Sequence, residues 1–95
     1  MQFNFQEPPM RFNFPRARFV DSNDIVKQAL HIDSEAIEVM LAVQQPGYDE
    51  VAMEIMDCLH SCETALRILQ EKHGFNLNEL RRAVEKKNQD RGYYA

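Results

Sequence analysis

From Asp21 onward, hydrophobic residues recur every three to four positions, which is the spacing of one face of an α-helix. The first helix is predicted to begin at Asp21 or Ser22, either of which can cap it, and to run to about Gln44. Pro46-Gly47 then stops the helix and makes a turn. The apolar stripe expected to face the core consists of Ile25, Ala29, Ile32, Ala36, Met40 and Val43, widened by Val26, Leu30, Ile37 and Leu41.

A second helix is predicted to begin near Tyr48 or Asp49 and to end at Gly74, with the positive Lys72 and His73 in its last turn. A short linker between two long helices predicts an antiparallel hairpin. The expected buried side of the second helix comprises Val51, Ile55, Cys58 or Leu59, Cys62, Ala65 or Leu66, and Leu69.

A third helix has a clear start, because Asn76 is followed three residues later by Glu79 in the manner of a capping box. Gly92 is its expected terminator, and its apolar side consists of Leu77, Leu80, Ala83 and Val84. The predicted fold class is therefore all-α, a helical hairpin plus a third helix. Its two wide apolar faces are more surface than one small subunit covers, so we expect a homodimer or dimer of dimers that completes a four-helix-type bundle.

Residues 1–20 differ from the helical domain, residues 21–95. They contain five of the six phenylalanines and three of the four prolines, and Phe-Asn-Phe occurs at Phe3–Phe5 and again at Phe12–Phe14. The alternation is typical of a strand, but the prolines would interrupt a strand ladder. We expect an extended arm whose phenylalanines dock on the helices, either as a lid or exchanged arm or as a tail packed on its own core.

Length, charge and cysteine spacing narrow the class of protein. At 95 residues the chain forms one small domain, and its net charge of −4 argues against a nucleic-acid polymer as partner. It has no apolar run of about 20 residues and no signal-peptide stretch, so we expect no membrane partner and a cytoplasmic location. Cys58 and Cys62, four apart on one helix, are poorly placed for a disulfide and are expected to be reduced and packed in the core.

Four carboxylates occupy matched positions on the two hairpin helices. Glu35 and Glu38 are three residues apart on the first helix, so they share a face. Glu54 and Asp57 have the same spacing on the second. Both pairs lie about two turns from Pro46-Gly47, so the hairpin can bring them to one site. Their neighbours are apolar, where acidic groups need a partner. Spacing alone also fits a solvated helix face, so both interpretations stay open.

A shared site of this kind predicts a divalent cation. Clustered carboxylates repel one another unless a cation neutralises them. Oxygen ligands suit hard ions, so we expect Mg²⁺, with Mn²⁺ as the alternative. Two such ions polarise a phosphoryl oxygen and activate a water, and one carboxylate can act as general base towards that water.

The order of these motifs carries a resemblance to a known family. Glu-x-x-Glu at residues 35–38 is followed, after a gap, by Glu-x-x-Asp at residues 54–57, and Gln28 precedes them at the usual distance. The third helix ends in residues 87–93, which resemble a Lys-Asn-x-x-Arg-Gly-Tyr ending. Over about residues 22–94 the chain resembles the all-α nucleoside triphosphate pyrophosphohydrolases of the MazG-like type.

The resemblance implies Mg²⁺-dependent hydrolysis of a nucleoside triphosphate, NTP or dNTP, to a nucleoside monophosphate and pyrophosphate, as part of nucleotide-pool clean-up. Glu35, Glu38, Glu54 and Asp57 would hold the metal and catalyse the reaction. Lys87, Asn88 and Arg91 would bind the substrate's phosphates, often at a subunit boundary. Without the resemblance, these three residues are typical of a solvated helix end, where positive side chains interact favourably with the helix dipole.

Two positions depart from the family's pattern. Ser34 stands where many members have Glu, and His31 stands where many have Lys. Both leave the four expected ligands intact but affect the expected activity and substrate preference. Two alternative functions remain: a non-catalytic helical interaction module that keeps the fold, and an enzyme like phosphoribosyl-ATP pyrophosphohydrolase. The Arg-Gly-Tyr ending favours the MazG-like group over the latter.

Overall fold

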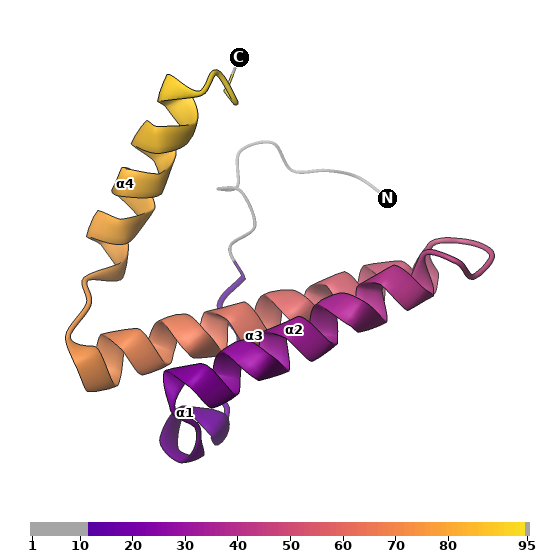
Figure 1. The fold of residues 1–95 in the computed structure, drawn as a ribbon, viewed down its shortest axis with the longest axis horizontal. Coiled ribbons are helices and arrows are strands. Elements are labelled where there is room, and N and C mark those ends of the chain that lie inside the picture. The colour runs from indigo at the N-terminus through magenta and orange to yellow at the C-terminus, as the bar shows by residue number, and fades with distance from the viewer. Residues whose placement is uncertain (1–11, 95) are drawn as a thin grey trace, which may run out of the picture.

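The computed structural model describes residues 12–94, and every regular element in that range is a helix (Figure 1). The helices in chain order are α1 (Phe19–Ser22), α2 (Ile25–Ala42), α3 (Asp49–His73) and α4 (Leu77–Asp90). The all-α class and the three long helices expected from the sequence are confirmed. The short helix α1 was not expected.

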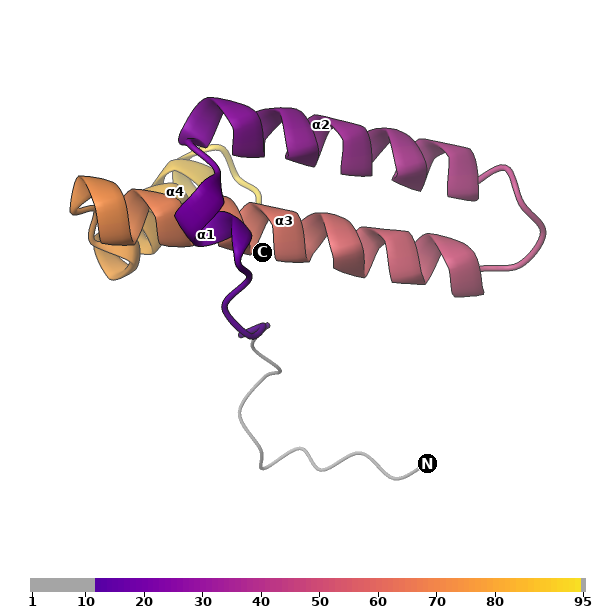
Figure 2. The same ribbon diagram turned by 90° about the horizontal axis from the view of Figure 1, so that it is seen from below.

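The two longest helices, α2 and α3, lie side by side as an antiparallel hairpin (Figures 1 and 2). α2 ends at Ala42, slightly before the expected Gln44. Gly47 in the turn has a φ of +79°, a backbone conformation that glycine adopts without strain. α3 begins at Asp49 and ends at Gly74, whose φ of +71° is typical of a helix C-cap. The predicted turn therefore determines which residues of the two helices meet.

The start of α2 corrects the sequence-based expectation. Asp24, rather than Asp21 or Ser22, caps the helix, and its Oδ1 accepts a hydrogen bond from the backbone N–H of Lys27 at 2.7 Å. Asp21 and Ser22 belong instead to α1, which ends at the extended residue Asn23. Several residues in this stretch can cap a helix, and sequence alone did not separate the one-turn helix from the long helix after it.

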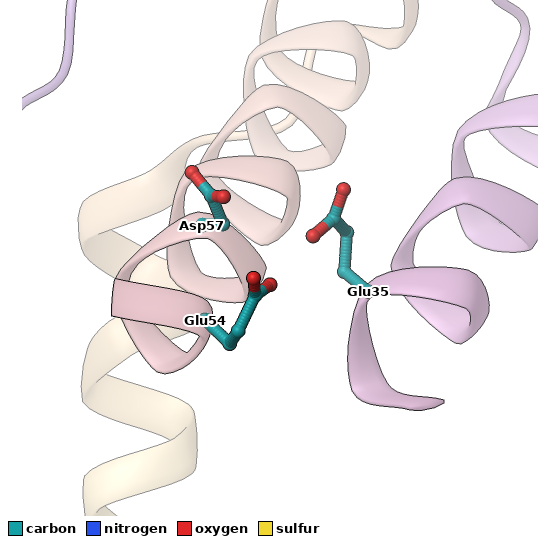
Figure 3. A group of neighbouring side chains, drawn as sticks. All are labelled: Glu35, Glu54 and Asp57. Atoms are coloured by element: carbon teal, nitrogen blue, oxygen red, sulfur yellow. The ribbon is translucent and has the colours of Figure 1, made fainter. Parts of the chain in front are cut away.

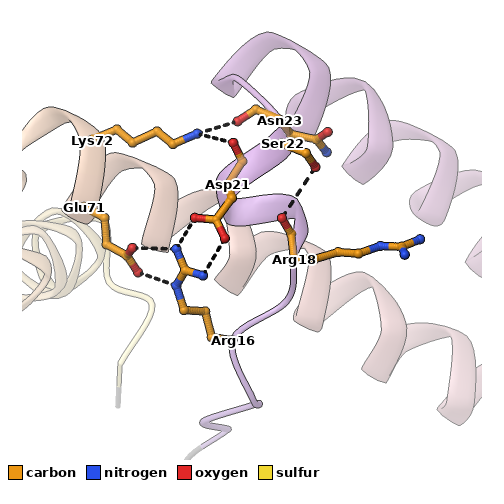
Figure 4. A network of polar contacts seen from close by, with 7 residues as sticks. All are labelled: Arg16, Arg18, Asp21, Ser22, Asn23, Glu71 and Lys72. Atoms are coloured by element: carbon orange, nitrogen blue, oxygen red, sulfur yellow. Dashed lines mark hydrogen bonds and ion pairs between the residues drawn. The ribbon is translucent and has the colours of Figure 1, made fainter.

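A cluster of polar contacts holds α1 against the end of α3 (Figure 4). The guanidinium of Arg16 donates to the carboxylate of Asp21 at 2.7 and 3.0 Å and to that of Glu71 at 2.9 and 3.1 Å. Lys72 donates to the backbone carbonyls of Asp21 and Asn23. The hydrogen bonds from Arg16 lower the pKa of both carboxyl groups. The contacts between Arg16 and α3 join residues far apart in the chain, so no local sequence pattern predicted them.

The described part of the N-terminal arm packs on α3. The ring of Phe14 stacks on His60, with ring centroids 4.5 Å apart. The backbone N–H of Phe14 donates to Glu63 at 2.8 Å, and Arg67 donates to the carbonyl of Phe14. Phe14 therefore contacts α3. The other Phe-Asn-Phe, at Phe3–Phe5, lies outside the described residues.

The buried core within one chain is small. Its apolar members among the described residues are Val20, Ala42, Ala65 and Ile68. The fully buried Gln28 ties the two hairpin helices together, because its Nε2 donates to the backbone carbonyl of Ser61 at 3.0 Å. Its Oε1 accepts from Asn23 at 2.8 Å. Such a buried amide is stable only with its hydrogen bonds made.

The apolar stripes expected to be buried are largely exposed in the single chain. On α2, Val26 and Leu30 are each 66% exposed and Met40 is 64% exposed. On α3, Ile55 is 52% exposed. The buried residues of α3 are Ser61, Thr64, Ala65 and Ile68. Within one chain the expected core side is thus largely uncovered on α2 but partly correct on α3, where Ala65 is buried and Val51, Cys62 and Leu69 are half-buried. Periodicity finds the face that avoids water without showing what covers it.

The last helix, α4, stands apart from the hairpin. The side chain of Asn76 accepts hydrogen bonds from the backbone N–H groups of Asn78 and Glu79, both at 3.1 Å, as the sequence predicted. Gly92, with a φ of +76°, follows the helix end. α4 leaves the end of α3 at a steep angle and makes almost no contact with α2 or α3 (Figure 1). None of its residues is buried.

Candidate metal centre

Three carboxylates meet between the hairpin helices. Glu35 extends from α2 toward Glu54 and Asp57 on α3 (Figure 3). One oxygen from each side chain lies within 4.8 Å of the other two. Glu35 and Glu54 are half-buried and Asp57 is exposed. The hairpin thus brings together one carboxylate of the first predicted pair and both of the second.

The fourth predicted ligand, Glu38, lies beside this group without being part of it. Its side chain is exposed on α2. Its negative charge still acts on Glu54, where it contributes to a raised pKa. Glu38 therefore adds to the negative potential of the site in this structure, while Glu35, Glu54 and Asp57 form its centre.

Among the described residues, no lysine or arginine offsets the negative charge of the site. The pKa of Glu54 is raised, first by its burial and then by the charges of Asp57, Glu38, Glu35 and Glu50. Among the ion pairs of residues 12–94, none joins Glu54 or Asp57 to a lysine or arginine. Repulsion of this kind is relieved by a proton or by a cation.

The donor set fits a hard divalent ion. Three carboxylates supply only oxygen ligands, as Mg²⁺ and Mn²⁺ prefer, and both helices hold them on a rigid frame. Within the described residues this is also the only group of three or more potential ligands that meets these distances. A Mg²⁺ ion bound here would complete its shell with waters or substrate phosphate oxygens.

A cavity of about 150 Å³ opens beside the carboxylates. Glu35 and Asp57 form part of its wall. The rest of the wall comes from Ala17, Phe19, Gln28, His31, His60, Ser61 and Thr64. Sequence reasoning missed His60, Ser61 and Thr64 as neighbours of the site. Ser61 and Thr64 continue the helical face of Asp57, and that spacing is the one signal that could have found them.

The two positions that depart from the family's pattern have different surroundings. His31 Nε2 lies 3.2 Å from Glu35 Oε1, and His31 Nδ1 lies 2.8 Å from Ser61 Oγ. Ser34 is exposed, and its hydroxyl donates to the backbone carbonyl of His31. His31 therefore touches the candidate site directly, whereas Ser34 bonds only to its own helix.

The predicted phosphate-binding residues are not at the carboxylates within one chain. Lys87, Asn88 and Arg91 lie at the end of α4, which extends away from the hairpin (Figure 1). Lys87 and Arg91 are exposed and Asn88 is half-buried. The prediction placed these residues at a subunit boundary. A role at the carboxylates would therefore require a second subunit.

The cysteines lie away from the acidic group. Cys58 and Cys62 are free thiols, half-buried rather than buried, in an apolar groove shared by α2 and α3. Burial and the neighbouring Cys58 raise the pKa of Cys62, so its thiol stays protonated at neutral pH. The expected reduced state is that of the structure.

No family model, curated protein or solved structure matches this chain. The resemblance to the MazG-like enzymes therefore stays a prediction from the motifs. Among residues 12–94, no helix combines the length and the apolar character needed to cross a membrane.

Proposed function

We propose that this protein is a Mg²⁺-dependent hydrolase that converts a nucleoside triphosphate, NTP or dNTP, to a nucleoside monophosphate and pyrophosphate. The observation that carries the proposal is the meeting of Glu35, Glu54 and Asp57, none of which is paired with a lysine or arginine among the described residues. A cation site alone does not indicate a substrate. The motif at residues 87–93 is the feature that favours a nucleotide as the substrate.

The three carboxylates would hold the ion and orient the substrate. A Mg²⁺ ion held there would supply Lewis-acid chemistry to the phosphoryl oxygens and to a water. One carboxylate would accept the proton of the attacking water. The water oxygen would bond to the α-phosphorus, and the bond from that phosphorus to the oxygen bridging to the β-phosphorus would break, so that pyrophosphate leaves. The exposed Asp57 is best placed to meet water, and Glu38 adds to the negative potential that attracts the cation.

A second copy of the chain completes the proposed protein. The outward stripe on α2, from Val26 through Leu30 and Ile37 to Leu41, is more than half exposed at each of these positions. An apolar face of this length needs a cover. Charge complementarity favours α4 as part of it: residues 25–73 contain nine acidic and three basic side chains, whereas residues 77–91 contain five basic and three acidic ones. A partner's α4 would bring Lys87, Asn88 and Arg91 towards the phosphates.

We expect Leu30→Glu to shift the protein from an oligomer to a monomer in sedimentation velocity. Leu30 is 66% exposed in one chain, so the change costs within about 0.5 kcal/mol if that surface stays in water. A buried interface would instead receive an uncompensated charge. Gln45→Glu, in the exposed turn beyond the end of α2, is the control and leaves the sedimentation coefficient unchanged. A monomeric wild-type protein would contradict the proposed assembly.

Pyrophosphate release from a panel of NTPs and dNTPs with Mg²⁺ tests the activity. Turnover of at least one nucleotide, stopped by EDTA and restored by excess Mg²⁺, is the expected result. Phosphoribosyl-ATP belongs in the panel, because its exclusive turnover would move the chain to that alternative activity. No release from any compound, together with no Mg²⁺ or Mn²⁺ binding, would leave the non-catalytic helical module as the function.

A further inference from the structure

A chain of polar contacts leads from the buried interior to one carboxylate of the site. Gln28 Nε2 donates to Ser61 Oγ at 3.3 Å, and Ser61 Oγ is hydrogen-bonded to His31 Nδ1 at 2.8 Å. On the other side of the ring, His31 Nε2 lies at an ion-pair distance of 3.2 Å from Glu35 Oε1. Gln28, His31 and Glu35 lie on α2 and Ser61 lies on α3, so the chain crosses to α3 and returns to α2 before it reaches Glu35.

The first hydrogen bond of this chain has its direction determined at the buried end. Asn23 donates to Gln28 Oε1 at 2.8 Å, which turns the amide N–H₂ of Gln28 towards Ser61. Ser61 Oγ accepts from that amide and keeps its own hydrogen available for His31 Nδ1. A carboxylate has no proton to donate, so the neighbouring Glu35 favours the tautomer with the ring proton on Nε2 and with Nδ1 as the acceptor from Ser61.

The buried end of the chain anchors the end at the site. Gln28 is fully buried and Ser61 is 4% exposed, whereas the side chains of His31 and Glu35 are 39% and 21% exposed. The ring of Phe19 packs beside that of His31, with centroids 5.7 Å apart. The buried amide and hydroxyl thus hold the imidazole in place beside the half-buried carboxylate of Glu35.

We propose that His31 is a positioning residue that fixes the orientation of Glu35 for metal binding. The inference rests on the proposed metal site. A glutamate side chain has several rotatable bonds, and an ion that binds it must otherwise order them. A donor at Nε2 holds the carboxylate in its bound orientation before the ion arrives, in the way that residues around a metal site orient its ligands.

The same residues do not form a nucleophile. Ser61 is 4% exposed, so a substrate does not reach its hydroxyl, and both its donor and an acceptor site are engaged by His31 and Gln28. The chain ends at the Glu35 carboxylate, which faces Glu54 and Asp57 (Figure 3). The arrangement therefore serves the carboxylate rather than the serine.

Two substitutions of His31 separate positioning from packing. His31→Gln places an amide N–H near the position of Nε2 and can keep the bond to Glu35. His31→Asn is shorter and leaves Glu35 without its donor. His31 is partly exposed, so both variants are expected to fold, which thermal unfolding checks. Ser34→Ala on the same helix is the matched control, because Ser34 bonds only to the backbone of His31.

Mn²⁺ binding, followed by electron paramagnetic resonance of the free ion, provides the first readout. We expect His31→Asn to raise the dissociation constant about tenfold, with His31→Gln and Ser34→Ala within about threefold of the wild type. Equal affinities for the wild type and His31→Asn would overturn the positioning role alone. A wild-type protein that binds no Mn²⁺ would overturn the metal site and the positioning role together.

The ¹⁵N chemical shifts of the His31 ring, measured without metal at pH 8, provide the second readout. They are expected to show a neutral ring with its proton on Nε2 in the wild type. Ser61→Ala should allow the other tautomer to appear, because the hydroxyl that donates to Nδ1 is gone. A ring protonated on Nδ1 in the wild type would overturn the proposal, since Nε2 would then offer no donor to Glu35.

Discussion

Glu54→Gln is expected to lower the rate of pyrophosphate release about 1,000-fold and to raise the melting temperature of the metal-free protein. Glu54 is a half-buried member of the carboxylate group, and its pKa is raised by burial and by four neighbouring acidic residues. The amide keeps its shape but loses the charge that binds the ion, and a metal ligand contributes several kcal/mol of transition-state stabilisation. The same change removes a repelling charge from the metal-free site.

A metal-binding role of Glu54 predicts opposite signs for the two effects, a lower rate of pyrophosphate release and a higher melting temperature without metal. Pyrophosphate release under saturating nucleotide measures the first effect, and thermal unfolding in EDTA measures the second. Glu50→Gln removes the same charge one turn earlier on α3, outside the group of three carboxylates, and is expected to leave the rate within about threefold. A Glu54→Gln variant with full activity would remove Glu54 from the site. A variant less stable than the wild type would contradict the repulsion.

Mg²⁺ is expected to raise the melting temperature by about 10–20 °C at pH 7.5 and by much less at pH 5. An ion that binds only the folded chain stabilises it by about 2.7 kcal/mol at 100 times its dissociation constant. In a domain of this size, each kcal/mol corresponds to roughly 4–8 °C. The raised pKa of Glu54 means that a proton competes with the ion above the ordinary value of 4.5.

The sign of the pH effect follows from that raised pKa. Below the ordinary value, Glu54 is protonated in both the folded and the unfolded chain, and its contribution to stability is fully present. As the pH rises through the raised folded-state pKa, that contribution is lost in the metal-free protein, and Mg²⁺ replaces the proton. Asp21 and Glu71, whose pKa values are lowered by Arg16, act alike with and without Mg²⁺.

Melting curves at both pH values, with and without Mg²⁺, measure the difference. NaCl at equal ionic strength is the control for screening, which weakens repulsion among exposed charges without a specific site. An equal rise with NaCl would show that the carboxylates hold no ion in particular. An equal rise with Mg²⁺ at both pH values would contradict the displacement of a proton from Glu54.

The acidic group could be predicted because its determinants are local. The i,i+3 spacing of Glu54 and Asp57 and the turn at Pro46-Gly47 are both visible in the sequence, and together they bring Glu35 across the hairpin. Glu38 could not be placed in the same way. Spacing shows that it shares a helix face with Glu35, but not which of the two lies within reach of the opposite helix.

The surroundings of the site could not be predicted. His31 appeared in the sequence only as a departure from a family pattern, and its partner Ser61 lies 30 residues away. Phe19 comes to the cavity through α1, which Arg16 holds to Glu71 on a distant part of the chain. Contacts of this kind depend on where two helices end up in space, and no periodicity encodes them.

The sequence by itself determined the three long helices, the antiparallel hairpin and the presence of carboxylates on both of its helices. Helix periods, caps and turns depend on residues close together in the chain, so they can be recognised in the sequence. Only the tertiary structure decided which helix faces are covered within one chain. It placed Gln28, Ser61 and Ile68 inside and left the apolar stripe of α2 outside. Hydrophobic burial is non-directional. An apolar stripe therefore shows that a helix face avoids water, but the residues that cover this face are known only from the assembled structure.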